Sequence, residues 1–129
     1  MRKIVSVVLR LVAAFIMLQT LYFKFTAQPE SVYIFTQAGM EPWGRIGTGV
    51  AELIASVLIL IPRTIVFGAL MAIGLMLGAI ATHLFILGVE VQNDGGQLFG
   101  YALIVLAASV VLLIMHFDRK LLSFKKPVL

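Results

Sequence analysis

Four ionisable side chains lie inside long apolar stretches of this sequence: Arg10, Lys24, Glu52 and His83. A charged group in a membrane core costs several kcal/mol, so there each would mark a site with a function. An imidazole changes its charge near neutral pH, and a carboxylate beside it offers a second proton carrier. Glu52 and His83 are therefore the first candidates for handling protons or binding a polar ligand.

The composition places these stretches in a membrane. Of the 129 residues, 61% are hydrophobic and 12% are charged, and the mean hydropathy is +1.08. A soluble domain carries roughly 25% charged residues, and a small soluble fold could not cover so much apolar surface. The sequence also has no cysteine. Disulfides, thiolate metal sites and thiol redox chemistry are therefore excluded, and no other metal motif is present.

Four segments are long and apolar enough to cross a bilayer, which takes about 20 residues. They run from about residue 4 to 23, 46 to 61, 64 to 88, and 98 to 116. Only Pro62 and Arg63 separate the second segment from the third, so these two must form an antiparallel hairpin. We predict an all-α fold: an integral membrane antiparallel four-helix bundle that forms one domain over residues 1–129.

Basic residues predict how the bundle lies in the membrane, because loops rich in Lys and Arg stay in the cytoplasm. The side with Lys24 and Arg45 also carries four acidic residues, Glu30, Glu41, Glu90 and Asp94. The other side carries Arg2, Lys3, Arg63, Arg119, Lys120, Lys125 and Lys126. We expect both termini in the cytoplasm and the protein in a bacterial inner membrane. Since these charges adjoin the spans, we expect contact with lipid and no nucleic-acid binding.

The loop between the first two spans predicts a short amphipathic helix at the outer surface. Pro29 suits the first turn of a helix and Gly39 suits its end. Tyr33 and Trp43 are expected at the level of the lipid headgroups. Two interpretations remain open, a lid over a site and a segment that returns the chain to the membrane surface.

The depths of the polar residues predict one layer in the outer half of the bundle. At 1.5 Å per residue, Glu52 lies ~9 Å and His83 ~8 Å below the outer edge. Lys24 ends the first span and Tyr101 begins the fourth, at about the same level. Lys24, Glu52, His83 and Tyr101 are therefore candidates for one ligand or proton site, with Arg10 as a further member.

Each of these residues also has a structural interpretation. Arg10 either extends to the inner headgroups or pairs with Glu52. Lys24 is either an interfacial anchor or part of the site, and Glu52 either belongs to a structural ion pair or carries the function. In the third span, Gly74, Gly78 and Thr82 have the spacing of small residues that permits close helix contact, which we expect here.

The sequence resembles the DoxX family of small four-span membrane proteins over nearly its whole length. The resemblance rests on Leu9-Arg10-Leu11, Lys24, the loop with Pro29, Phe35, Gly39 and Pro42, the run Gly49–Leu58 around Glu52, and His83. It implies a four-helix membrane bundle and a connection with membrane redox chemistry. Some relatives are subunits of quinone-reducing complexes, and others associate with soluble redox enzymes.

Three functions follow as hypotheses. The first is a non-catalytic or quinone-binding subunit of an oxidoreductase, in which Glu52 and His83 handle protons beside a bound quinone and a redox protein is the partner. The second is a small proton-coupled transporter or permeation protein that uses Glu52. The third is a structural or assembly protein without a ligand. A homo-oligomer is compatible with all three.

Overall fold

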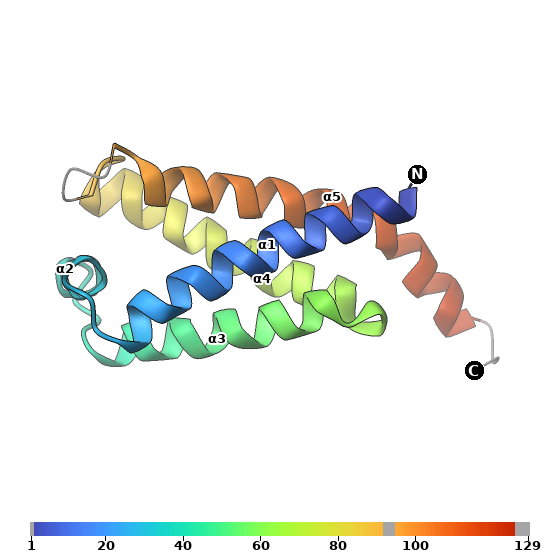
Figure 1. Ribbon diagram of the computed structural model, residues 1–129, viewed down its shortest axis with the longest axis horizontal. Coiled ribbons are helices and arrows are strands. Elements are labelled where there is room, and N and C mark those ends of the chain that lie inside the picture. Colours follow the sequence, from blue (N-terminus) through green and yellow to red (C-terminus); the bar gives the residue numbers. More distant parts are fainter. Residues whose placement is uncertain (1, 92–94, 126–129) are drawn as a thin grey trace.

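A computed structural model describes residues 2–91 and 95–125, with side chains as far as residue 117. The described residues form helices joined by short turns, and they contain no strand. The elements are α1 (Arg2–Phe25), α2 (Pro29–Gln37), α3 (Trp43–Leu60), the 3₁₀ turn η1 (Pro62–Thr64), α4 (Ile65–Thr82), the π-helical turn η2 (His83–Leu87) and α5 (Gln97–Lys125). Figure 1 shows the long helices side by side, with α2 at one end.

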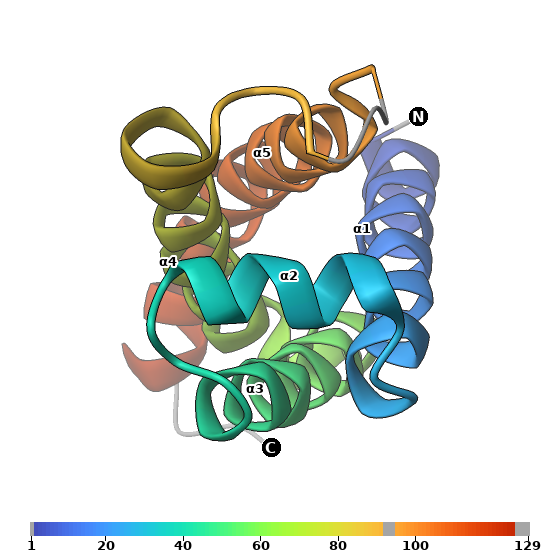
Figure 2. The ribbon, with the colours of Figure 1, turned by 90° about the vertical axis from the view of Figure 1, so that its left-hand side faces the viewer.

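Within the described residues, four helical segments are long and apolar enough to cross a membrane: α1, α3, the continuous run Pro62–Leu87, and Gln97–Phe117 of α5. Looking down the bundle, α1 packs against α3 and α5, and α4 packs against the same two helices (Figure 2). Large apolar side chains such as Phe15, Leu70 and Ile114 lie exposed on the outside, as lipid contact requires. The predicted all-helical membrane bundle is confirmed.

The core of the bundle consists mainly of small side chains. Ala13, Ala55, Ala69 and Ala72 are fully buried, and Ala102 and Ala108 are nearly so. Without a hydrophobic force between helices in lipid, close packing of small residues is what holds such helices together. Met17, Ile59, Val105 and Leu112 fill the remaining space in this core.

The two ends of the bundle differ. One end, here called the closed end, holds the start of α1 and the turn η1 (Figure 1). There α1 reaches α5, since the Ser6 hydroxyl lies 2.7 Å from Nε2 of His116, and α3 reaches α4 at Gly68. The other end holds α2 and a cavity, and it is here called the cavity end. There α1 contacts α3 through Lys24 and Glu52, and η2, which continues α4, contacts α5 through the rings of His83 and Phe99.

The predicted close contact at Gly74 and Gly78 is wrong. A Cβ atom added at either glycine would meet nothing within 4 Å, because both face open space on α4 at the cavity end. The close approach occurs instead at Gly68, where an added Cβ would lie 2.5 Å from the backbone nitrogen of Ile59. Small-residue spacing marks helices that are able to approach closely, but it does not identify which glycine does so.

Helix α2 confirms the predicted short helix between the first two spans. It begins at Pro29, in the first turn as expected, and the chain leaves it through Gly39, whose φ of 75° favours glycine. In Figure 2 it crosses the cavity end of the bundle. It contacts α1, α3 and η2, so it bridges the two helix pairs at the end where they separate.

Candidate functional site

A cavity of about 400 Å³ lies at the cavity end of the bundle, beneath α2. Its walls are mostly apolar and include Ile16, Phe23, Phe35, Leu75, Met76 and Val105. The polar side chains along it are Thr20, Lys24, Glu30, Ser31, Thr48, Glu52, Thr82, His83 and Tyr101. Ligand pockets usually enclose about 300–1,000 Å³ and combine apolar walls with a few polar groups. This cavity fits that description.

Lys24 and Glu52 form an ion pair at the base of the cavity. Nζ of Lys24 lies 2.9 Å from Oε1 of Glu52, and their side chains are 14% and 5% exposed. Among the described residues, no hydrogen-bond donor besides this ammonium reaches Oε1. A carboxylate so deeply buried is stabilised only when it is paired, because removing a charge from water is costly. The structure therefore couples the end of α1 to the middle of α3.

The second carboxylate oxygen of Glu52 is bound only weakly. The Thr20 hydroxyl lies 3.5 Å from Oε2 of Glu52 but 3.0 Å from the carbonyl oxygen of Met17. One hydroxyl has one proton to donate, and 3.5 Å is at the limit of a hydrogen bond. Oε2 therefore keeps the capacity to accept a hydrogen bond from a molecule in the cavity.

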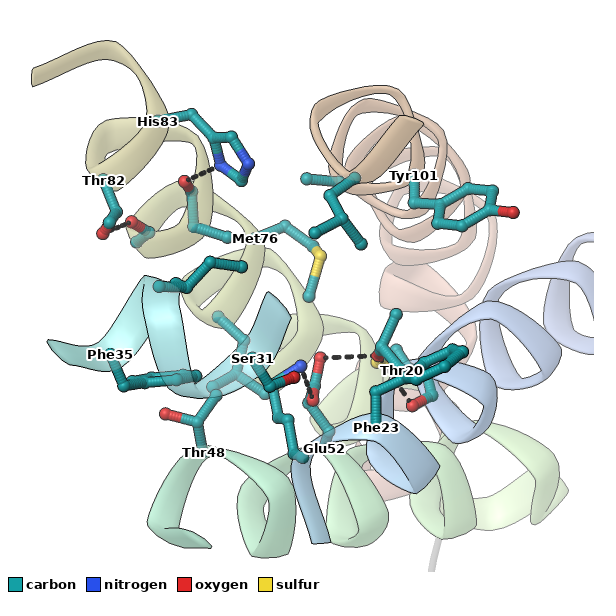
Figure 3. Close-up of a pocket in the computed structure, with 18 of the residues that line it drawn as sticks. Thr20, Phe23, Ser31, Phe35, Thr48, Glu52, Met76, Thr82, His83 and Tyr101 are labelled. Carbon is teal, nitrogen blue, oxygen red and sulfur yellow. Dashed lines mark hydrogen bonds and ion pairs between the residues drawn. The ribbon is translucent and has the colours of Figure 1, made fainter. Parts of the chain in front are cut away.

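His83 lines the opposite wall of the cavity, where α4 passes into η2 (Figure 3). The residue is 5% exposed. Nδ1 lies 2.8 Å from the carbonyl oxygen of Ala79, and the ring meets that of Phe99 edge to face at 5.6 Å. Nε2 is buried, and no described residue binds it. An imidazole held on one side with its second nitrogen free is suited to bind a ligand.

The structure brings four of the five predicted site residues to one cavity: Lys24, Glu52, His83 and Tyr101. Glu52 and His83 lie on different walls, and neither bonds to the other, so a ligand between them would be needed to connect them. Tyr101 lines the cavity, and its hydroxyl accepts a hydrogen bond from Nε2 of Gln97 at 2.9 Å. In Figure 3 this hydroxyl points away from Glu52 and His83.

Arg10 lies outside the cavity. Its Nε and Nη2 atoms donate to the carbonyl oxygens of Ile59 and Leu60, at 2.9 and 2.7 Å. These carbonyls end α3, where the helix leaves its last carbonyl groups without partners inside the helix. Arg10 thus caps α3 at the closed end and does not pair with Glu52, which the sequence left open.

Arg10→Met is expected to destabilise the bundle and leave the cavity intact. A hydrogen bond from a charged group contributes about 1.5–3 kcal/mol, and this variant removes two from the end of α3. Unfolding by SDS in mixed micelles, followed by circular dichroism, should show a loss of that order. Arg10→Lys should recover part of it, because an ammonium reaches the carbonyls without the fork of the guanidinium. Equal stability of wild type and Arg10→Met would contradict this role.

Arg45 has a structural role that the sequence analysis did not predict. It is 7% exposed, and its guanidinium binds both carboxylate oxygens of Glu41 and the carbonyl oxygen of Lys24. It therefore joins the start of α3 to the end of α1, directly above the ion pair. The i,i+4 spacing of Glu41 and Arg45 is a signal that could have indicated their pairing.

Thr20 and Ser31 are further cavity residues that the sequence analysis missed. Thr20 precedes Lys24 by four positions, so the two share a face of α1, and this spacing could have revealed it. Ser31 lies on the loop helix α2, is 7% exposed and lines the cavity. No sequence pattern separates a serine above a cavity from one above water.

The fold and the cavity define a class of protein: a small helical membrane protein whose four spans enclose a site with an ion pair and a histidine. Comparison with known families identifies which one. The chain matches the DoxX-like family over residues 8–115, which include the whole of α3 and α4, most of α1 and α5, and the five predicted site residues, and it belongs to that family. No curated protein and no solved structure matches the chain.

Proposed function

We propose that this protein is a non-catalytic subunit of a membrane redox system and that it holds a quinone in the cavity. The observation that carries the proposal is an apolar cavity, between helices long enough to cross a membrane, with Glu52 and His83 on different walls. A quinone, whether oxidised or reduced, has an apolar ring and two oxygens on opposite sides, which is the same arrangement of apolar and polar groups. The connection that the family resemblance implies with quinone-reducing complexes supports the same conclusion.

The shape of the bundle favours binding over permeation. Below the cavity, the core is closed by Ala13, Ile59, Ala72, Ala108 and Leu112, which are at most 4% exposed. Glu52 is also held by Lys24 at 2.9 Å, whereas a carboxylate that exchanges protons or cations across a membrane must leave its partner in each cycle. A molecule in this cavity is therefore enclosed on one side of the bundle.

The orientation and the partners belong to the same proposal. The distribution of Lys and Arg favours both termini in the cytoplasm of a bacterial cell, with the cavity in the outer half of the inner membrane. In this proposal, electrons pass between the quinone and a redox partner protein, either directly at the cavity end or within a larger assembly.

Filling the cavity provides the test. Gly78 lines the cavity, and an added Cβ there meets nothing within 4 Å, so Gly78→Phe introduces a ring at a position with open space beside the backbone. Leu77→Phe is the matched control, because Leu77 is exposed on the same turn of α4 and does not line the cavity. Both proteins are purified gently from native membranes, and their lipid extracts are analysed by mass spectrometry. We expect quinone with wild type and Leu77→Phe, and a loss of at least about tenfold with Gly78→Phe, equivalent to 1.4 kcal/mol.

Several results would contradict the proposal. Wild-type protein without quinone, or equal quinone content in all three proteins, would show that the cavity is not a quinone site. Flux of protons or small solutes in proteoliposomes that depends on Glu52 would replace the proposed role with transport. Co-purification of a protein partner with neither quinone nor flux would leave a structural or assembly role.

A further inference from the structure

The hydrogen bond from His83 to the backbone determines what its free nitrogen offers to a ligand. A carbonyl oxygen only accepts hydrogen bonds, so Nδ1, at 2.8 Å from the oxygen of Ala79, must carry the proton. A neutral imidazole has one N–H, which leaves a lone pair on Nε2. In the neutral imidazole this buried nitrogen, which no described residue binds, is therefore a hydrogen-bond acceptor on a residue that lines the cavity.

The wall formed by α1 and α3 offers an acceptor as well. Oε2 of Glu52 has only the long contact with Thr20, and the Thr20 proton has a nearer acceptor in the carbonyl oxygen of Met17. Oε1 is occupied by Lys24. The carboxylate is thus able to accept one more hydrogen bond without giving up its ion pair.

The other polar groups along the cavity differ in what they offer a ligand. The ammonium of Lys24 directs one of its three N–H groups at Oε1 of Glu52, and the Thr82 hydroxyl donates to the carbonyl oxygen of Gly78 at 2.8 Å. The Tyr101 hydroxyl points away (Figure 3). Hydroxyls such as those of Ser31 and Thr48 are able to donate or accept and do not discriminate. Nε2 of His83 and Oε2 of Glu52 are thus groups in fixed orientation that act only as acceptors, and these two favour a ligand that donates hydrogen bonds.

We propose that the cavity binds the reduced, hydroxyl-bearing form of its ring ligand, a quinol, in preference to the oxidised quinone. This inference rests on the function proposed above. One quinol hydroxyl donates to Nε2 of His83 and the other donates to Oε2 of Glu52. A quinone has two carbonyl oxygens in these places, and each would face a lone pair. A buried acceptor left without a donor is unfavourable, because it has lost its hydrogen bonds to water and gained none in return.

The direct test compares three forms of one ring. A short-tailed benzoquinol, its dimethyl ether and the corresponding benzoquinone are titrated into wild-type protein in detergent micelles, without oxygen, by calorimetry. The ether keeps the ring and loses the donors. We expect the quinol to bind at least about tenfold more tightly than either of the others, the effect of a 1.4 kcal/mol difference. His83→Phe keeps a ring beside Phe99 and removes the acceptor, so the preference for quinol over quinone should fall.

The proton on His83 is checked separately. The sequence has two histidines, so His116→Gln leaves one imidazole to observe by nitrogen-15 NMR. We expect the proton on Nδ1, an unprotonated Nε2, and an upfield change at Nε2 when quinol is added. This measurement does not depend on the folding of a His83 variant.

The outcomes separate the two proposals. Equal or tighter binding of the quinone or the ether overturns the preference for quinol and leaves the quinone site in place. A proton on Nε2 also overturns the preference. If none of the three compounds binds, both proposals fail.

Discussion

Lys24→Met is expected to reduce the stability of the bundle by about 3–5 kcal/mol, the cost of removing one partner of a buried ion pair. The loss arises because Glu52 is 5% exposed and Oε1 has Lys24 as its sole partner in the described part of the chain. The methionine keeps the apolar length of the lysine and removes only its charge. Reversible unfolding by SDS in mixed micelles, followed by circular dichroism, measures the difference.

The double variant Lys24→Met/Glu52→Leu distinguishes pairing from packing. Replacing both members of a buried pair by apolar residues is often neutral or stabilising, so this protein should recover wild-type stability or exceed it. It should nevertheless lose quinol binding, since Oε2 of Glu52 is gone. Lys3→Met is the control, because Lys3 is exposed on the same helix and a surface change is usually within about 0.5 kcal/mol. A double variant as unstable as the single one would show that the pair does not account for the loss.

Gly68→Ala is expected to destabilise the protein by about 1–3 kcal/mol, the usual cost of overpacking a core. The added methyl group would lie 2.5 Å from the backbone nitrogen of Ile59 and 2.9 Å from the carbonyl carbon of Leu58. Backbone atoms are unable to move aside as a flexible side chain does, so α3 and α4 must separate at the closed end.

Gly78→Ala is the matched control on the same helix. Its new methyl group meets nothing within 4 Å, and alanine is the better helix former by as much as about 1 kcal/mol. We expect stability equal to or above that of wild type in the same unfolding assay. Similar losses in the two variants would mean that the close approach of α3 and α4 is not confined to Gly68.

The fold could be predicted from the sequence because hydropathy and chain length restrict it strongly. Four apolar segments in lipid must be helices, and the two-residue break at Pro62 and Arg63 makes two of them antiparallel. The loop helix could also be predicted, since Pro29 and Gly39 mark its ends. The order of the helices around the bundle could not be predicted, because it depends on which faces of two helices fit together.

The candidate site could likewise be predicted in part. Depth along a helix follows from counting residues, so Lys24, Glu52, His83 and Tyr101 were expected in one layer and line one cavity. The direction in which a side chain points around the helix axis depends on the neighbouring helices, and the sequence predicted these directions less well. The Arg10 side chain binds the carbonyl groups at the end of α3, and Gly74 and Gly78 face open space where helix contact was expected. The tautomer of His83 depends on a backbone carbonyl, which the sequence does not reveal.

The ion pair also has an electrical consequence. Lys24 and Glu52 carry opposite charges 2.9 Å apart, so a field along the bundle pulls them with nearly equal and opposite forces. A single charge carried across the whole bilayer changes its energy by about 2.3 kcal/mol per 100 mV, whereas the pair together contributes almost nothing. The affinity of the site for a neutral ring bound beside the pair should therefore not depend on the membrane voltage. Removing either partner would leave a charge that the voltage does act upon.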